Sequence, residues 1–497
     1  MSWLLGLHLL LLPKNILALL AGSVIGLFLG TLPGLGPAFS LTIFVPLTFN
    51  LSAETALTFL VAMYTAAVFG GAITAILINV PGHPGNIATM FDGQPMARQG
   101  RAAEAIAAVG VAGTVGGLLA VLLLVLVAPY ITNIAMKISP ADYFMLALFG
   151  LTMVAATAGK KMLQGLILGG LGFILSTVGQ DPITGNYRFT FGSEYLYSHG
   201  VSFGAMAIGI FALGSAFLMI EERQLPKPLV KPEKVKGHFK VGIVSVFRHP
   251  IEILRASVIG VVMGVIPGLG IAISNIAAYL VESKVKPNAG WGQGNVVGVM
   301  APEAADNATL ISELIPAFTL GIPGALTSAL MLDAITVHGL QPGPEFFHGN
   351  PITSSFFLAM FLSQIVFAAL GILLAPFLAK AAYVPTSILA PIIIVAGCVG
   401  AYAVNGSIGD IVVALIFGVI GYIIMKLKLP LAPMVLGALL GPLAENNYYL
   451  ALIISQANGH SAFLAPLPII LGILIIGMIS YIIFDSRKES KRAASHC

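Results

Sequence analysis

Apolar stretches of about 20 residues recur along the whole chain, and they constrain its fold more than any other feature. A helix of that length crosses the ~30 Å hydrocarbon core of a bilayer, where every backbone N–H and C=O must be bonded within the protein. Only 9% of the residues are charged and 58% are hydrophobic, whereas a soluble domain carries about 25% charged residues. The pattern predicts an all-α, polytopic membrane protein that is surrounded by the lipid bilayer.

The apolar segments are uneven in length, and one polar stretch divides them. They are expected near residues 14–31, 38–50, 54–79, 104–137, 140–157, 162–179, 201–220, 252–266, 271–282, 295–322, 352–377, 386–404, 406–425, 430–449 and 462–484. Several are short or interrupted by Gly and Pro, so we expect about 11 to 15 crossings with some re-entrant helices. The predicted organisation is a first membrane repeat (1–220), a cytoplasmic linker (221–250), a second membrane repeat (251–485) and a cytoplasmic tail (486–497).

Lys and Arg side chains indicate the orientation of the chain. Alternation of the segments places all of them except Lys14, Lys137 and Arg188 on one side. Cytoplasmic loops carry an excess of Lys and Arg, so this side, with the C-terminus, is predicted to be cytoplasmic. The net charge of +4 therefore reports orientation, and no nucleic-acid partner is expected.

Two motifs occur once in each half of the chain. GTLPGLGP at 30–37 returns as GVIPGLGI at 264–271, and NVPG at 79–82 returns as GIPG at 321–324. A weaker match pairs the segment from Val154 with the segment from Val399, and its polar centre lies inside in one copy and outside in the other. The sequence therefore predicts two inverted-topology repeats, a common plan in secondary transporters.

Pro-Gly pairs within apolar segments predict helices that unwind and restart. The breaks are placed at Pro33, Pro81, Pro267 and Pro323. A restarted helix points free N–H groups and its positive dipole end into the protein, which suits an anion such as a carboxylate. The alternative is that each break is only a packing kink. We assign to substrate binding the glycines and polar residues at or after the breaks: Gly34, Gly36, Ser40, Asn79, Gly82, Gly85, Gly268, Gly270, Ser274, Asn275, Gly324, Thr327 and Ser328.

Carboxylates occur in a segment that the repeat places inside the membrane. Tyr64 and Asp306 both lie 17 residues before the proline of their motif, so residues 301–313 match part of an apolar helix. Glu303, Asp306 and Asn307 have the i, i+3, i+4 spacing of one helix face. Intramembrane carboxylates usually mark ion pathways, and oxygen ligands suit Na⁺ or H⁺. We assign Glu303, Asp306, Asn307 and Thr319 to a coupling ion; the alternative is a solvated loop over 283–308.

Other polar residues carry weaker signals. Asp92 and Arg98 are interpreted as a polar cytoplasmic connection, and Glu445 as part of a helix-end loop. The histidines lack metal-ligand spacing such as HExxH, no CxxC pair is present, and no phosphate-binding Walker motif occurs. We therefore expect no enzyme activity, no cofactor and no metal other than a coupling Na⁺. Fifty-six glycines and 30 prolines favour a transporter over a passive structural membrane protein.

Several long motifs resemble one transporter family from end to end. They occupy residues 30–49, 75–106, 176–192, 301–309, 319–347 and 430–447. In these segments the chain is similar to the large membrane subunit of tripartite tricarboxylate transporters, the TctA family. The family's Gly/Pro motifs fall on Pro33, Gly34, Gly36, Asn79, Pro81, Gly82, Gly268, Gly270, Gly321, Pro323 and Gly324, and its acidic motif falls on Pro302, Glu303 and Asn307.

The resemblance implies a three-part system in the bacterial cytoplasmic membrane. A periplasmic solute-binding protein captures a small carboxylate, a small membrane subunit assists, and the large subunit forms the path, driven by a Na⁺ or H⁺ gradient. The chain departs from the family at Asp306, where Asn is usual, and near Glu313, where small apolar residues are usual. The alternatives are a secondary anion transporter working without a capture protein and, more distantly, a membrane-embedded enzyme.

Overall fold

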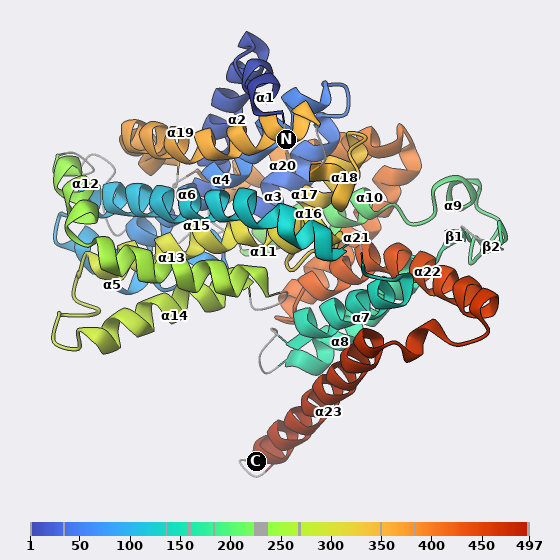
Figure 1. The fold of residues 1–497 in the computed structure, drawn as a ribbon. Helices are drawn as coiled ribbons and strands as arrows, with labels where there is room; N and C mark the ends of the chain where they lie inside the picture. Colours follow the sequence, from blue (N-terminus) through green and yellow to red (C-terminus); the bar gives the residue numbers. More distant parts are fainter. Residues whose placement is uncertain are drawn as a thin grey trace.

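The computed structural model describes residues 2–32, 35–135, 137–156, 161–181, 184–222, 237–266, 270–347, 350–381 and 384–494. These residues are almost entirely helical, as the sequence predicts (Figure 1). In the first half the elements are α1 (Trp3–Leu10), α2 (Pro13–Thr31), α3 (Pro37–Leu47), α4 (Ala53–Ile78), η1 (Pro84–Asn86), α5 (Thr89–Arg98), α6 (Ala102–Ala135), α7 (Pro140–Ala156), α8 (Met162–Leu175), β1 (Gly179–Gln180), β2 (Tyr187–Arg188), α9 (Glu194–His199), α10 (Phe203–Ala207), the π-helical η3 (Ile208–Leu213) and α11 (Gly214–Glu222).

The second half contains a similar succession of helices. Its elements are α12 (Phe239–Arg248), α13 (Pro250–Val265), α14 (Gly270–Val285), α15 (Val297–Ser312), α16 (Leu314–Leu320), α17 (Leu326–Val337), α18 (Pro344–Phe347), α19 (Pro351–Ala381), α20 (Thr386–Asn405), α21 (Ile408–Lys426), α22 (Ala432–Asn458), η5 (Ala462–Leu464) and α23 (Pro466–Ala494). Among the described residues, eight helices are long and apolar enough to cross a membrane, and four shorter ones are apolar. The chain is therefore a multi-pass, all-helical membrane protein.

The order of elements around the breaks is repeated. In the first half, α2 leads to a break and α3, and α4 leads to a second break before α5 and α6. In the second half, α13 leads to a break and α14, and α15 with α16 leads to a second break before α17 and α19. The packing follows the same plan, since α15 packs against α6 and α4 packs against α19.

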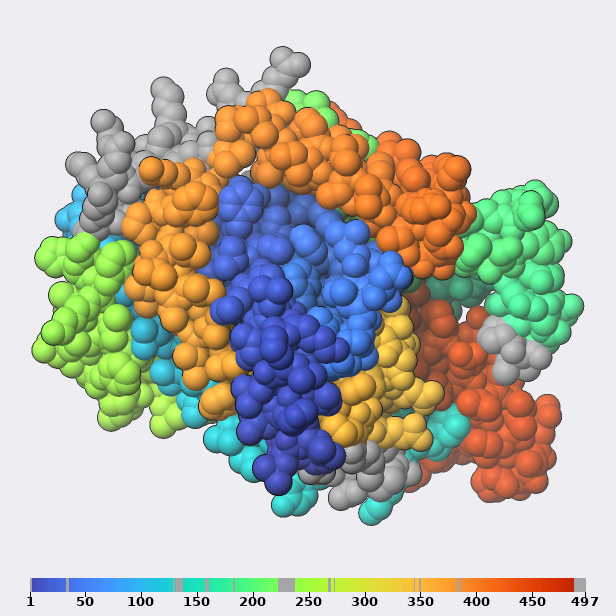
Figure 2. All heavy atoms as spheres, turned by 90° about the horizontal axis from the view of Figure 1, so that it is seen from above, coloured from blue at the N-terminus to red at the C-terminus, as the bar shows by residue number. Residues whose placement is uncertain are grey.

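The helices form two groups that meet near the middle of the molecule. The first group contains α1, α2, α4–α6, α12–α16, α18 and α19, and the second contains α7–α11 and α20–α23. Figure 1 shows α7, α8, α22 and α23 together, apart from α6, α13 and α15. From above, the N-terminal helices lie against α19 (Figure 2). The helices α3 and α17 contact members of both groups.

Glycine brings helix backbones into direct contact within each group. In the first group, a Cβ on Gly30 of α2 would overlap the carbonyl oxygen of Ala67 in α4, and a Cβ on Gly260 of α13 would overlap that of Ala305 in α15. In the second group, a Cβ on Gly172 of α8 would overlap the carbonyl oxygen of Met434 in α22. Small residues at membrane helix contacts allow this approach.

We expect Gly116→Val to destabilise the first group. Gly116 of α6 faces Ala304 of α15 so closely that a Cβ would overlap the Ala304 carbonyl oxygen. Overpacking of this kind costs about 1–3 kcal/mol, so the thermal midpoint of the detergent-purified protein should fall by several degrees. Gly477→Val is the matched control, because a Cβ at Gly477 would meet nothing within 4 Å. Equal midpoints for the two variants would contradict the close packing.

Two interpretations of polar residues need correction. Asp92 is fully buried, not part of a solvated connection: its carboxylate accepts hydrogen bonds from the Tyr279 hydroxyl (2.9 Å) and from backbone N–H groups of the loop before α15. Glu445 lies within α22 and pairs with both Arg188 Nη atoms (2.6 and 3.0 Å), which raises the pKa of the Arg188 guanidinium.

Candidate functional site

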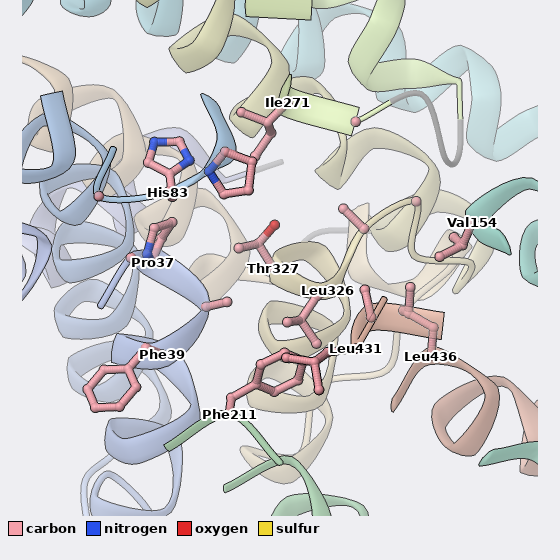
Figure 3. A pocket seen from close by; sticks show the side chains of 18 of the residues that line it. Pro37, Phe39, His83, Val154, Phe211, Ile271, Leu326, Thr327, Leu431 and Leu436 are labelled. Atoms are coloured by element: carbon pink, nitrogen blue, oxygen red, sulfur yellow. The ribbon is translucent and has the colours of Figure 1, made fainter. Parts of the chain in front are cut away.

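A cavity of about 500 Å³ lies where the broken segments end (Figure 3). It is lined by residues that follow all four breaks, although these breaks are far apart in the sequence. The stretches that contribute are 36–39, 82–84, 270–273 and 324–327. Its opposite wall is apolar and comes from Val154 of α7, Phe211 and Ser215 of η3 and α11, and Leu431, Ala432 and Leu436 at the start of α22. The cavity therefore lies between the two helix groups.

Three helices begin at this cavity. Gly36 is the N-cap of α3, Gly270 starts α14 with a φ of +68°, and Ala325 is the N-cap of α17. The first N–H groups of a helix have no partner within the helix, and the dipole makes this end positive. No Lys or Arg is among the described residues that line the cavity. An anion bound there would be held by helix ends and not by ion pairs with Lys or Arg.

The sequence-predicted substrate residues fall into three sets. Gly36, Gly82, Gly270, Gly324 and Thr327 line the cavity. Gly34, Gly268, Pro33 and Pro267 lie outside the described residues. The others do not line the cavity. The hydroxyls of Ser40 and Ser328 donate to the carbonyls of Gly36 and Ala325. Ser274 accepts a hydrogen bond from Thr309, and Asn275 accepts one from the Ala88 N–H. Gly85 lies next to Asp306, and Asn79 is exposed at the end of α4.

The acidic segment is a buried helix and not a solvated loop. All residues of α15 are buried, and Glu303 and Asp306 are fully enclosed. The Glu303 carboxylate accepts hydrogen bonds from Thr89 Oγ1 (2.5 Å) and Asn86 Nδ2 (2.9 Å). Asp306 Oδ2 lies 3.4 Å from Asn86 Nδ2 and 3.1 Å from His83 Nε2. Because His83 lines the cavity, its ring connects the cavity wall to Asp306.

A second carboxylate also reaches the cavity through one side chain. Glu313 Oε1 accepts hydrogen bonds from the Tyr64 hydroxyl (2.9 Å) and from Thr327 Oγ1. Thr327 lines the cavity, so it links the cavity wall to Glu313 as His83 links it to Asp306. Tyr64 also donates to the Leu310 carbonyl (2.9 Å), which fixes α4 against α15.

Five buried side-chain oxygens of this region have no hydrogen-bond partner among the described residues. They are Asn86 Oδ1, Glu303 Oε2, Asp306 Oδ1, Asn307 Oδ1 and Glu313 Oε2. Buried oxygen acceptors without donors are the atoms that a hard cation or added protons would satisfy. The side chain of Asn307 faces Gly113 of α6, and the Thr319 hydroxyl donates to the Ile315 carbonyl within α16. These two residues, which the sequence assigns to ion binding, therefore do not join Asn86 in contacting Glu303 and Asp306.

Sequence reasoning missed His83. A single histidine shows no ligand spacing, and the only signal was its position inside the second break, between Gly82 and Pro84. In the structure His83 Nδ1 accepts from the Gly85 N–H (3.2 Å), so a neutral ring carries its proton on Nε2, the atom that faces Asp306. The backbone of the second break, through the Gly85 N–H, thus determines the tautomer of His83, which lies between the cavity and α15.

Comparisons with known proteins agree with the geometry. A family model for the tripartite tricarboxylate transporter TctA family matches residues 16–436. The chain is 32% identical over 485 residues to an uncharacterized 52.8 kDa protein in the TAR-I ttuC' 3'region of Agrobacterium vitis, covering 96% of this chain and 95% of that protein. It is 31% identical over 226 residues to an uncharacterized protein in the TAR-II ttuC' 3'region of the same organism, covering 45% of this chain and 93% of that protein. The chain therefore belongs to the tripartite tricarboxylate transporter TctA family.

Proposed function

We propose that this chain is the large translocation subunit of a binding-protein-dependent, ion-gradient-driven secondary transporter for small carboxylates in the bacterial inner membrane. The family supports a transporter subunit of a tripartite system. The observation that carries the finer proposal is the central cavity, where the starts of α3, α14 and α17 meet around a space of about 500 Å³. That volume suits a small organic anion, and the helix starts supply donors at positive dipole ends.

The coupling ion is proposed to bind in the acidic layer behind the cavity. This layer contains three buried carboxylates, and each has one oxygen without a hydrogen-bond donor among the described residues: Glu303, Asp306 and Glu313. Such a layer is unfavourable unless a cation or protons neutralise it. His83 and Thr327 contact both the cavity and this layer, so binding of the anion and binding of the ion share side chains. Na⁺ and H⁺ both satisfy this chemistry.

The inverted repeat is proposed as the basis of alternating access. The repeated order of broken helices and the reciprocal packing of α15 on α6 and α4 on α19 support it. In this arrangement, α2 and α3 enter from the outer side and α13 and α14 enter from the cytoplasmic side. Binding sites at such repeat interfaces lie near the membrane midplane.

Reconstitution tests the proposal. The purified chain is placed in proteoliposomes with the small membrane subunit, and uptake of labelled citrate is followed with and without the periplasmic capture protein. We expect uptake only with the capture protein and an imposed Na⁺ or pH gradient, and none on adding ATP alone. Full uptake without the capture protein would instead establish a stand-alone anion transporter. No uptake under any gradient, with folded protein and all partners present, would overturn the proposed function.

A further inference from the structure

A second cavity, of about 340 Å³, is lined by polar residues that the proposed mechanism does not use. Its walls come from the C-terminal halves of α3 and α17, the start of α10 and the end of α20. The α9 and α10 region lies on the opposite side of the molecule from α12 (Figure 1). We refer to this space as the outer cavity and to the first as the central cavity.

The two cavities share three elements. In α3 the central cavity is lined by residues up to Phe39 and the outer cavity from Thr42 onward. In α17, Thr327 lines the central cavity and Leu330 lines the outer cavity. In the continuous helix formed by α10, η3 and α11, Phe211 lines the central cavity and Ala207 lines the outer cavity. The residues between are all buried: Ser40 and Leu41, Ser328 and Ala329, and Ile208 to Ile210. One packed layer therefore separates two spaces along the same helices.

This layer coincides with irregular backbone. Ile208–Leu213 is π-helical, so the separating turn of the α10–α11 helix differs from the α-helical turns on either side. Single π-helical turns often occur at functional sites. The position of the irregular turn fits a layer that rearranges when the two cavities connect.

Asp333 is the only carboxylate among the described residues that line the outer cavity. Among the described residues, none forms a hydrogen bond or ion pair with its side chain, although it lies in an apolar helix. The other polar side chains that line the outer cavity are Thr42, whose hydroxyl donates to the Ala38 carbonyl, Ser202, whose hydroxyl accepts from the Ala205 N–H, and Asn405, whose amide nitrogen donates to Asp410. An ionisable group at membrane depth without a protein partner indicates a functional site.

We propose that the outer cavity is the outward vestibule of the translocation path and that Asp333 binds a monovalent cation there. One carboxylate matches one positive charge, and the cavity has room for the hydration shell that the cation retains. A carboxylate at this place repels free anions, so the vestibule admits the cation while the substrate anion requires delivery. The inference rests on the proposed function only for the direction of transport.

Cysteine labelling tests it without measuring uptake. Cys398→Ser and Cys497→Ser remove the native thiols, and Val337→Cys, at the outer cavity and 44% exposed, is the reporter. Right-side-out vesicles are treated with cationic and anionic membrane-impermeant methanethiosulfonates. We expect the cationic reagent to react about five- to tenfold faster, and Asp333→Asn to abolish the preference. Replacing choline by Na⁺ in the buffer should slow the reaction of Val337→Cys with the cationic reagent, and only in the background that retains Asp333.

Matched variants make each result decisive. His460→Cys, exposed in the loop between α22 and η5, should react equally with both reagents in either background. If His460→Cys reacts and Val337→Cys does not, the cavity is closed to the outside and the vestibule is refuted. If Val337→Cys still reacts faster with the cationic reagent in the Asp333→Asn background, cation binding at Asp333 is refuted. Asp333→Ser replaces Asp333→Asn in this test if the Asn variant folds poorly. Because labelling does not need turnover, these outcomes are independent of whether the uptake experiment succeeds.

Discussion

Glu303→Gln should lower coupled uptake by about 10- to 100-fold, the range expected when an interaction with a buried charged group is lost. Thr89 and Asn86 both donate to Glu303 Oε1, so the amide oxygen of Gln can keep these bonds, but its nitrogen replaces Oε2, the oxygen without a donor among the described residues. The substitution also removes the charge that the coupling ion neutralises. The measurement is citrate uptake in proteoliposomes with a fixed amount of capture protein, scanned over Na⁺ concentration and pH.

Two comparisons isolate the role of this carboxylate. Glu345→Gln makes the same chemical change at an exposed position in α18 and should leave uptake unchanged. Asp306→Asn, which introduces the residue usual in the family, should be far milder than Glu303→Gln and should make uptake more strictly dependent on Na⁺. If Glu303→Gln keeps both the Na⁺ and the pH dependence of the wild type, the carboxylate is structural and the coupling site lies elsewhere.

Gly85→Ala should reduce uptake by about 10- to 100-fold through overpacking at the acidic layer. A Cβ at this position would overlap Asp306 Oδ1 and the Ile271 side chain, which lines the central cavity. A single methyl group would therefore disturb both proposed sites. Uptake is measured as before, after size-exclusion chromatography has shown that the variant is folded.

Gly170→Ala provides the control, because a Cβ there would meet nothing within 4 Å. Its uptake should equal that of the wild type. We also expect the Gly85→Ala variant to require a higher Na⁺ concentration or a different pH for half-maximal uptake. Wild-type uptake and wild-type ion dependence in Gly85→Ala would show that the break near Gly85 has no part in coupling.

The sequence predicts most of the helices because long apolar runs have few alternatives in a membrane. The segment expected at 54–79 is α4, and that expected at 140–157 is α7. Several helices were not predicted, among them the amphipathic or polar α5 and α12, because they lack an apolar run. For α5 the deciding contact is tertiary: Asp92 is held by Tyr279 and the loop before α15, which no local pattern reveals.

The candidate site is predictable only in part. The breaks are visible as Pro-Gly pairs, and the burial of the carboxylates agrees with the predicted repeat, which matches Asp306 to Tyr64. The opposite wall is not visible, because Phe211 and Leu436 belong to apolar segments in which every residue has the same character. The roles of His83 and Asp333 depend on which helices lie beside them, and a single residue carries no spacing that indicates this.

The glycine contacts determine which parts of the molecule can move independently. Backbones locked as closely as α2 on α4, or α8 on α22, cannot slide without separating, so each helix group should behave as one rigid body. Across the central cavity the groups present side chains such as Phe211 and Leu431 on one side and Ile271 on the other, which can exchange neighbours. We therefore expect a crosslink within a group to leave transport intact, and a crosslink across the cavity to arrest it.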